Sequence, residues 1–194
     1  MKDVSITLLF LATSITNGFQ ALLHSDSTGA NHLDHHRAIK ISTYGIIFMG
    51  TPHQGGDGVD LGKRLAHIAS IFVNTNQRLL DILKRDSEIL QQQIARYNSI
   101  SSHFDTKFAF ETKPTSLKIL PAMIIVPRSS AVVPGHVDAE AIAIMADHTK
   151  MVKFGSENAS EYRKVAGHLK IMADKAPAKV RENWSTEGVI QARK

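Results

Sequence analysis

Nearly continuous apolar runs of strand length recur along the chain, each separated from the next by helical or loop sequence. The runs are Val4 to Ala12, Tyr44 to Met49, Lys107 to Phe110, Ala122 to Val126 and Ala141 to Met145. Continuous rather than alternating hydrophobicity is typical of strands that are covered on both faces, as in a parallel sheet flanked by helices. The sequence therefore predicts an α/β fold with a mostly parallel sheet.

Helical spacing is clearest from Leu79 to Ile94, where apolar residues recur every three or four positions and charged residues take the other face. An earlier helix is predicted from about Val59 to Phe72. A last helix is predicted from Ser156 to Lys175, followed by a tail that has Pro177 near its start.

Size and composition favour one domain. The 194 residues, 43% of them hydrophobic, suffice for one core and not for two, so we expect a domain over residues 1–184 and a C-terminal tail over residues 185–194. The chain has no cysteine, which excludes disulfides and thiolate zinc sites and favours a cytoplasmic protein. Residues 1–14 have the outline of a signal peptide, although Asp3 interrupts its basic region, so secretion is the alternative. The apolar stretch in this segment is too short to span a bilayer, and no transmembrane segment is predicted.

Basic residues gather toward the C-terminus and give the chain a formal charge of +5. Acidic residues interleave with them, and aromatic content is only 6%, so this pattern indicates a solvated helix face. We expect no nucleic-acid partner.

The segment YGIIFMGTPHQGG, from Tyr44 to Gly56, is an apolar run that ends in a glycine-rich turn. A strand, a glycine turn and a helix form the context in which backbone amides bind phosphate. A phosphate loop needs Lys and then Ser or Thr after its second glycine, but Gly56 and Asp57 stand at those positions. A nucleotide site is therefore not expected here.

Three segments carry a resemblance to a known family: STYGIIFMGTPHQGG, VPRSSAVVPG and ADHTKMVKF. They closely resemble the fungal branch of the α/β-hydrolase superfamily that is related to serine-active-site-containing, serine-esterase and lipase-like proteins. The likeness extends from about Leu22 to Trp184. It implies the C-terminal part of an α/β-hydrolase fold, in which the GTPH turn borders the hydrolase cleft. In fungi such domains often stand at the front of larger NTPase or repeat-containing receptor proteins.

The resemblance implies a serine nucleophile on a GxSxG elbow between a buried strand and a helix. Ser14 stands at this position after the run VSITLLFLA, but Ala12 and Thr16 replace the two glycines. Thr16 adds a β-branched side chain where crowding is least tolerated. From its residue type alone, Ser14 can equally be a plain turn or helix-cap residue.

His148, which follows a strand-like run and precedes the last helix, stands where the family has its catalytic histidine. An imidazole can take the serine proton and return it to the leaving group near neutral pH. Glu111 ends the run KFAF and resembles the family's strand-ending acid, so we expect it to orient the imidazole. Asp147 and Asp138 are the alternative acids.

Other histidines do not lead to a metal or cofactor prediction. His32, His35 and His36 lie close together with Asp34, but no second cluster completes a coordination shell, and this segment matches the family's lead-in to a strand. His53, in the GTPH turn, is expected to hold the loop by a hydrogen bond from its side chain to backbone. We predict no cofactor.

The strands that precede the nucleophile strand in the family, and the oxyanion-hole loop after one of them, have no counterpart here. We therefore expect an N-terminally truncated hydrolase whose first strand exposes an unpaired edge to a protein partner. Two functions remain open: serine hydrolysis of an acyl or lipid ester, or a non-catalytic interaction module. Because the elbow is altered, no measurable esterase activity is expected from this chain alone.

Overall fold

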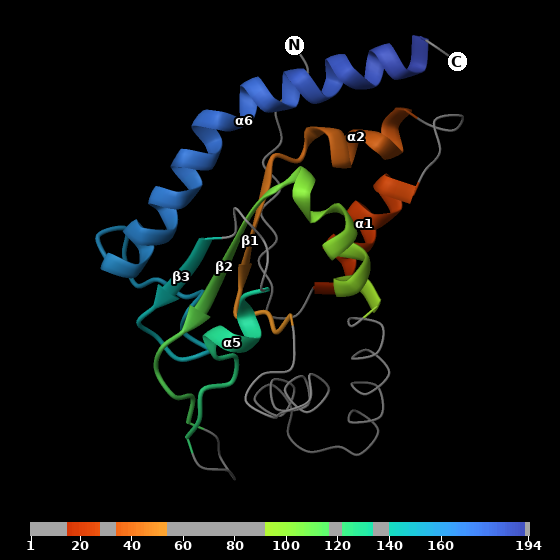
Figure 1. Ribbon diagram of the computed structural model, residues 1–194. Coiled ribbons are helices and arrows are strands. Elements are labelled where there is room, and N and C mark those ends of the chain that lie inside the picture. Colours follow the sequence, from red (N-terminus) through yellow and green to blue (C-terminus); the bar gives the residue numbers. More distant parts are fainter. Residues whose placement is uncertain (1–14, 28–33, 54–91, 117–121, 134–139, 193–194) are drawn as a thin grey trace.

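The computed structural model describes residues 15–27, 34–53, 92–116, 122–133 and 140–192 (Figure 1). The first elements are α1 (Ile15–Ser27), α2 (Asp34–Ser42) and β1 (Gly45–Met49). Next come a helical stretch over residues 92–100, the 3-10 helix η1 (Ser101–His103) and β2 (Asp105–Glu111). The last are α5 (Arg128–Ala131), β3 (Glu140–Ile144) and α6 (Ser160–Ala192).

The three strands form a parallel sheet with β2 in the middle. Gly45 of β1 lies opposite Asp105 of β2, and Lys107 of β2 lies opposite Glu140 of β3. Three of the predicted apolar runs became these strands, and the small parallel sheet with its helices agrees with the predicted α/β class. Because the strands run in one direction, their carboxyl ends meet at the same edge of the sheet.

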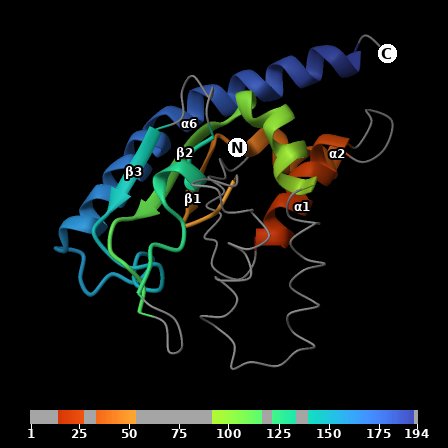
Figure 2. The same cartoon turned by 60° about the horizontal axis from the view of Figure 1, so that its bottom comes forward.

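Strand side chains alternate between two apolar layers. Phe48 and Phe108 lie in the layer that contains residues of α1 and of the 92–100 helix. Met49 and Ala109 lie in the layer that contains residues of α6. Figures 1 and 2 show α1 and α6 on opposite sides of the strands. Burial on both faces explains why β1 is apolar throughout. In β3, Ile142 and Ile144 are buried, whereas Ala143 is exposed.

Helix α6 is much longer than the sequence predicted. Its first part packs on the sheet through residues such as Met172, which is fully buried. Its last part contacts α2, where Arg37 pairs with Glu187 at 2.9 Å and Trp184 Nε1 donates to Ser42 Oγ at 3.2 Å. The helix therefore joins the sheet to α2.

The predicted end of the last helix at Lys175 is wrong, because α6 continues through Pro177. A proline in a helix interior removes one backbone hydrogen bond and costs about 3 kcal/mol. The contacts of the last part with α2 offset that cost. The expected boundary between domain and tail, after residue 184, falls inside this helix.

The predicted strand from Ala122 to Val126 is also wrong. Met123 forms an isolated antiparallel bridge with Thr115, and no strand is assigned over this segment. Ile125 and Val126 are apolar because they pack with Ala131 in a small buried cluster. The segment therefore has the apolar composition of a strand, but it is a buried loop that forms only one bridge.

Several predicted elements lie outside the described residues. These are the strand Val4 to Ala12 with its exposed edge, the helix Val59 to Phe72, and the helix Leu79 to Ile94 as far as residue 91. Within the described ranges, none of the helices is both long and apolar enough to cross a membrane.

Candidate functional site

The carboxyl edge of the sheet holds two of the residues that the sequence singled out, Glu111 and His148. Glu111 is the last residue of β2, and His148 follows the end of β3 by four positions. Because β2 and β3 are parallel neighbours (Figure 1), both residues lie at the same edge of the sheet. In open α/β sheets this edge is where ligands bind.

Glu111 and His148 form a buried pair. Nδ1 of His148 lies 3.4 Å from Oε2 of Glu111, and the two side chains are 4% and 0% exposed. An ionised carboxylate can only accept a hydrogen bond, so the contact favours the tautomer with hydrogen on Nδ1. Oε1 of Glu111 accepts a hydrogen bond of 2.5 Å from the backbone N–H of Val126. The carboxylate is therefore held from two sides.

His148 is held through its backbone as well. Its N–H donates to Oγ1 of Thr115 at 2.9 Å, and Thr115 is itself buried. Thr115 exchanges two backbone hydrogen bonds with Met123, of 2.8 and 3.2 Å. The connection that follows β2 thus supplies both the Val126 amide that holds the acid and the hydroxyl that holds the histidine.

Gly50 packs closely against the imidazole of His148. It follows β1 directly, its N–H donates to the carbonyl of Ala109 at 2.8 Å, and its φ is +63°. A Cβ on this residue would lie 2.9 Å from Cε1 of His148 and 2.8 Å from Sδ of Met151. The glycine in the GTPH turn is therefore needed for its backbone conformation and for the close approach of His148.

Asp147, one of the alternative acids, forms hydrogen bonds within its own turn. Its Oδ1 accepts hydrogen bonds from both amides of Thr149 and Lys150 and from the Thr149 hydroxyl, at 2.7 to 3.0 Å. Burial opposes ionisation, but these hydrogen bonds and the charge of Lys150 outweigh it and lower the pKa of the Asp147 carboxyl. Asp147 thus shapes the turn that carries His148. Asp138 lies outside the described residues.

The proposed nucleophile, Ser14, also lies outside the described residues, and α1 begins at the next residue. His53 is described and buried. Its backbone N–H donates to the carbonyl of Ser130 at 2.8 Å, and its ring packs edge-on against Phe48 and Phe108. His53 therefore fixes the turn after β1 on the layer opposite α6.

The histidine cluster noted in the sequence lies largely outside the described residues. His32 and the side chains of Asp34, His35 and His36 fall outside the described part of the chain. Among the residues that the structure describes, no group of three or more histidine, aspartate or glutamate side chains is arranged to hold a metal ion.

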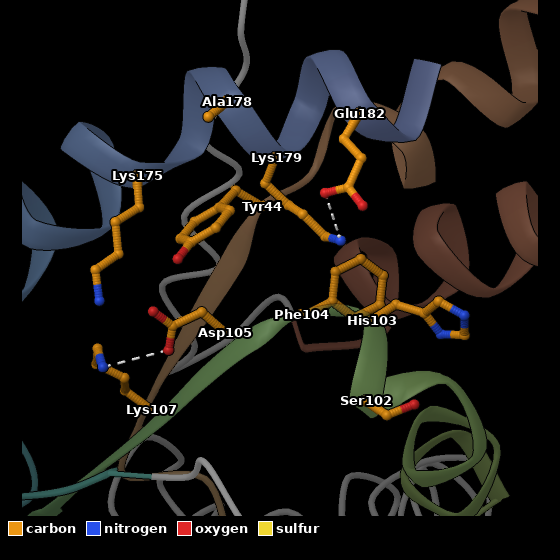
Figure 3. A pocket seen from close by; sticks show the side chains of 10 residues that line it. All are labelled: Tyr44, Ser102, His103, Phe104, Asp105, Lys107, Lys175, Ala178, Lys179 and Glu182. Carbon is orange, nitrogen blue, oxygen red and sulfur yellow. Dashed lines mark hydrogen bonds and ion pairs between the residues drawn. The ribbon is translucent and has the colours of Figure 1, made fainter. Parts of the chain in front are cut away.

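A hollow of about 650 Å³ lies at the opposite, amino edge of the sheet, between the starts of β1 and β2 and the middle of α6 (Figure 3). Its lining includes Tyr44, Asp105, Lys107, Lys175, Lys179 and Glu182. Lys107 contacts Asp105 at 3.3 Å, and Lys179 contacts Glu182 at 3.0 Å, so two of the three lysines are paired with carboxylates of the same chain. The hollow lies at the edge opposite the Glu111–His148 pair, and its lining mixes three lysines with two carboxylates, which indicates no single class of ligand.

Thr115, Val126 and Met151 were missed at the sequence level. Thr115 and Val126 reach the site because the chain reverses its direction between Thr115 and Met123. Pro114 and Pro121 are local signals of a turn, but they do not indicate which groups contact Glu111 and His148. Gly50 was noted as part of a glycine-rich turn, but its contact with His148 depends on strand order.

No protein-family model, curated protein or solved structure matches this chain.

Proposed function

We propose that this chain is an α/β-hydrolase-like protein whose site serves serine ester hydrolysis, with an acyl or lipid ester as substrate. Ser14 is the nucleophile, His148 the general base and Glu111 the carboxylate that orients the base. The observation that carries the proposal is the buried contact of 3.4 Å between His148 and Glu111 at the carboxyl edge of a parallel sheet.

The chemistry follows from the tautomer that this contact favours. With hydrogen on Nδ1, the other ring nitrogen, Nε2, is the basic one and takes the Ser14 proton as the hydroxyl attacks the ester carbonyl. The imidazolium that forms is stabilised by Glu111, and it then protonates the departing alcohol. Water attacks the acyl group on Ser14 with the same help from His148, which releases the acid and restores the site.

The order of these residues along the chain gives further support. α/β-Hydrolases carry serine, acid and histidine in that order, and here the order is Ser14, Glu111 and His148. The acid ends one strand, and the histidine follows the neighbouring parallel strand. This arrangement is compatible with the hydrolase fold that the sequence resemblance implies.

We expect ester turnover by this chain to be too slow to measure. Ala12 and Thr16 stand where the elbow has glycines, and a β-branched residue next to a strained turn disfavours the sharp backbone reversal that exposes the hydroxyl. A single-turnover probe is therefore a more sensitive test than ester turnover. The competing function is that of a non-catalytic interaction module.

Incubation of the full chain with a fluorophosphonate, followed by mass mapping of the adduct, tests the proposal. We expect slow labelling of Ser14 that is lost in Ser14→Ala. His148→Ala should slow labelling by about a hundredfold or more, because general-base assistance typically contributes that much. Glu111→Gln should also slow it, because the amide leaves the imidazole without its carboxylate.

His103→Ala is the matched control, because His103 is an exposed histidine at the amino edge of the sheet. Its labelling rate should equal that of the wild type. If the wild type shows no adduct, or an adduct that persists in both Ser14→Ala and His148→Ala, the hydrolase function is wrong and the interaction module takes its place.

A further inference from the structure

The outer edge of β3 is the feature from which we infer a property beyond ester hydrolysis. Among the described strands, β3 stands at the end of the sheet, with β2 on one side. The carbonyl of Ile144 accepts from Thr112 N–H at 3.0 Å and therefore faces the β2 side. Because the N–H and C=O of one residue in a strand face the same side and those of the next residue face the opposite side, the carbonyl of Ala143 and the N–H of Met145 face away from β2.

Both outward groups are bound by side chains of α6. Nζ of Lys164 donates to the carbonyl of Ala143 at 2.6 Å. Oε2 of Glu161 accepts from the N–H of Met145 at 2.9 Å. The same Oε2 lies 2.9 Å from Nζ of Lys164, so the two side chains also pair with each other along the helix.

This arrangement copies one residue of an additional parallel strand. In a parallel ladder, a single residue of the neighbouring strand donates its N–H to one carbonyl and accepts from the N–H two residues further on. Lys164 takes the place of that N–H, and Glu161 takes the place of that carbonyl. The pair thus occupies one pairing position on the edge of β3.

The pair is polar and only partly covered. The side chains of Glu161 and Lys164 are 19% and 39% exposed, and Met145 is 64% exposed. Burial opposes ionisation of Glu161, but the hydrogen bonds from Lys164 and Met145 outweigh it and lower the pKa of its carboxyl. Ala143 is also exposed and has a short side chain, so the side chains of β3 itself leave its edge accessible.

We propose that the outer edge of β3 is a strand-pairing surface that Glu161 and Lys164 keep closed to a second copy of this chain. A second copy is the partner that fits, because its own β3 edge presents the same outward N–H and carbonyl groups. Two such edges can pair antiparallel about a twofold axis, as edge strands do when nothing blocks them.

The test compares Glu161→Ala/Lys164→Ala with Lys179→Ala/Glu182→Ala by sedimentation over a range of concentrations. The second variant removes an ion pair with the same spacing on the same helix that makes no contact with β3. We expect the weight-average mass of the first variant to rise with concentration above that of the wild type. The control variant should match the wild type.

Hydrogen exchange at the Met145 amide shows whether the edge has been opened. Exchange should accelerate in dilute Glu161→Ala/Lys164→Ala and slow again when that variant associates. If the edge opens but the mass stays that of the control, the proposal is wrong. Association that leaves the Met145 amide unprotected would place the contact elsewhere and would equally overturn it.

A second variant protects the test against loss of folding. The exchanged pair, Glu161→Lys/Lys164→Glu, keeps the ion pair and the net charge but presents the wrong group to Ala143 and to Met145. It should associate as the alanine variant does. The matched exchange, Lys179→Glu/Glu182→Lys, should sediment like the wild type, and association by both exchanged variants alike would contradict the proposal.

Discussion

At the scale of single residues, Glu111 is the feature that most needs explanation. A fully buried carboxylate is costly unless it is hydrogen-bonded and faces a partner that can carry charge. Val126 supplies the hydrogen bond and His148 supplies the partner. A glutamine would meet the hydrogen bond equally well, so the choice of a carboxylate points to the imidazole.

Gly50→Ala is expected to lower the free energy of unfolding by about 1–3 kcal/mol, because a side chain at positive φ is strained and its Cβ would clash with His148 and Met151. Denaturant unfolding measures the change. The matched control is Gly167→Ala in α6, where a Cβ meets nothing within 4 Å. That substitution should instead raise stability by about 0.5–1 kcal/mol, because alanine favours a helix. Equal effects at the two positions would refute this account of Gly50.

At the scale of elements, the connection after β2 organises the site. Residues 112–116 and 122–126 lie side by side through the bridge between Thr115 and Met123. Their contacts with Glu111 and His148 hold these two side chains together at the carboxyl edge of the sheet. We infer that the geometry of the pair depends on this connection as much as on the strands.

Thr115→Val keeps the shape of the side chain but leaves the buried N–H of His148 without its acceptor. An unpaired buried donor costs about 1–3 kcal/mol, so the free energy of unfolding should fall by that amount. Thr115→Ser retains the hydroxyl and loses only a methyl group, for which about 0.8 kcal/mol is expected. Hydrogen exchange at the His148 amide should accelerate in the valine variant alone. Unchanged exchange there would show that Thr115 does not hold His148.

The elements also show how far sequence reasoning reached. The strand regions at Tyr44 to Met49 and Lys107 to Phe110 were predictable because strands buried on both faces are largely apolar. The run Ala141 to Met145 is also apolar, although Ala143 and Met145 are exposed. The same rule failed at residues 122–126, because a packed connection is equally apolar. The rule that a proline ends a helix failed at Pro177, because local propensity carries no information about the contacts between α6 and α2.

At the scale of the whole molecule, the site joins positions that are distant in the chain. Glu111 and His148 were expected to meet on the basis of family resemblance, and parallel strand order is the physical reason that they do. Thr115 and Val126 had no comparable signal, because their positions depend on how the chain turns back. The proposed hydrolase function also requires Ser14, near the start of the sequence, to lie beside His148.

The most direct test asks whether residues 14 and 148 share one pocket. Because the chain has no cysteine, Ser14→Cys/His148→Cys can be treated with a short thiol-specific cross-linker without a background reaction. The control is Ser14→Cys/Lys179→Cys, since Lys179 lines the hollow at the opposite edge of the sheet. Our account predicts an intramolecular cross-link in the first variant and none in the control. A cross-link in the control alone, or in neither variant while both thiols remain reactive, would contradict it.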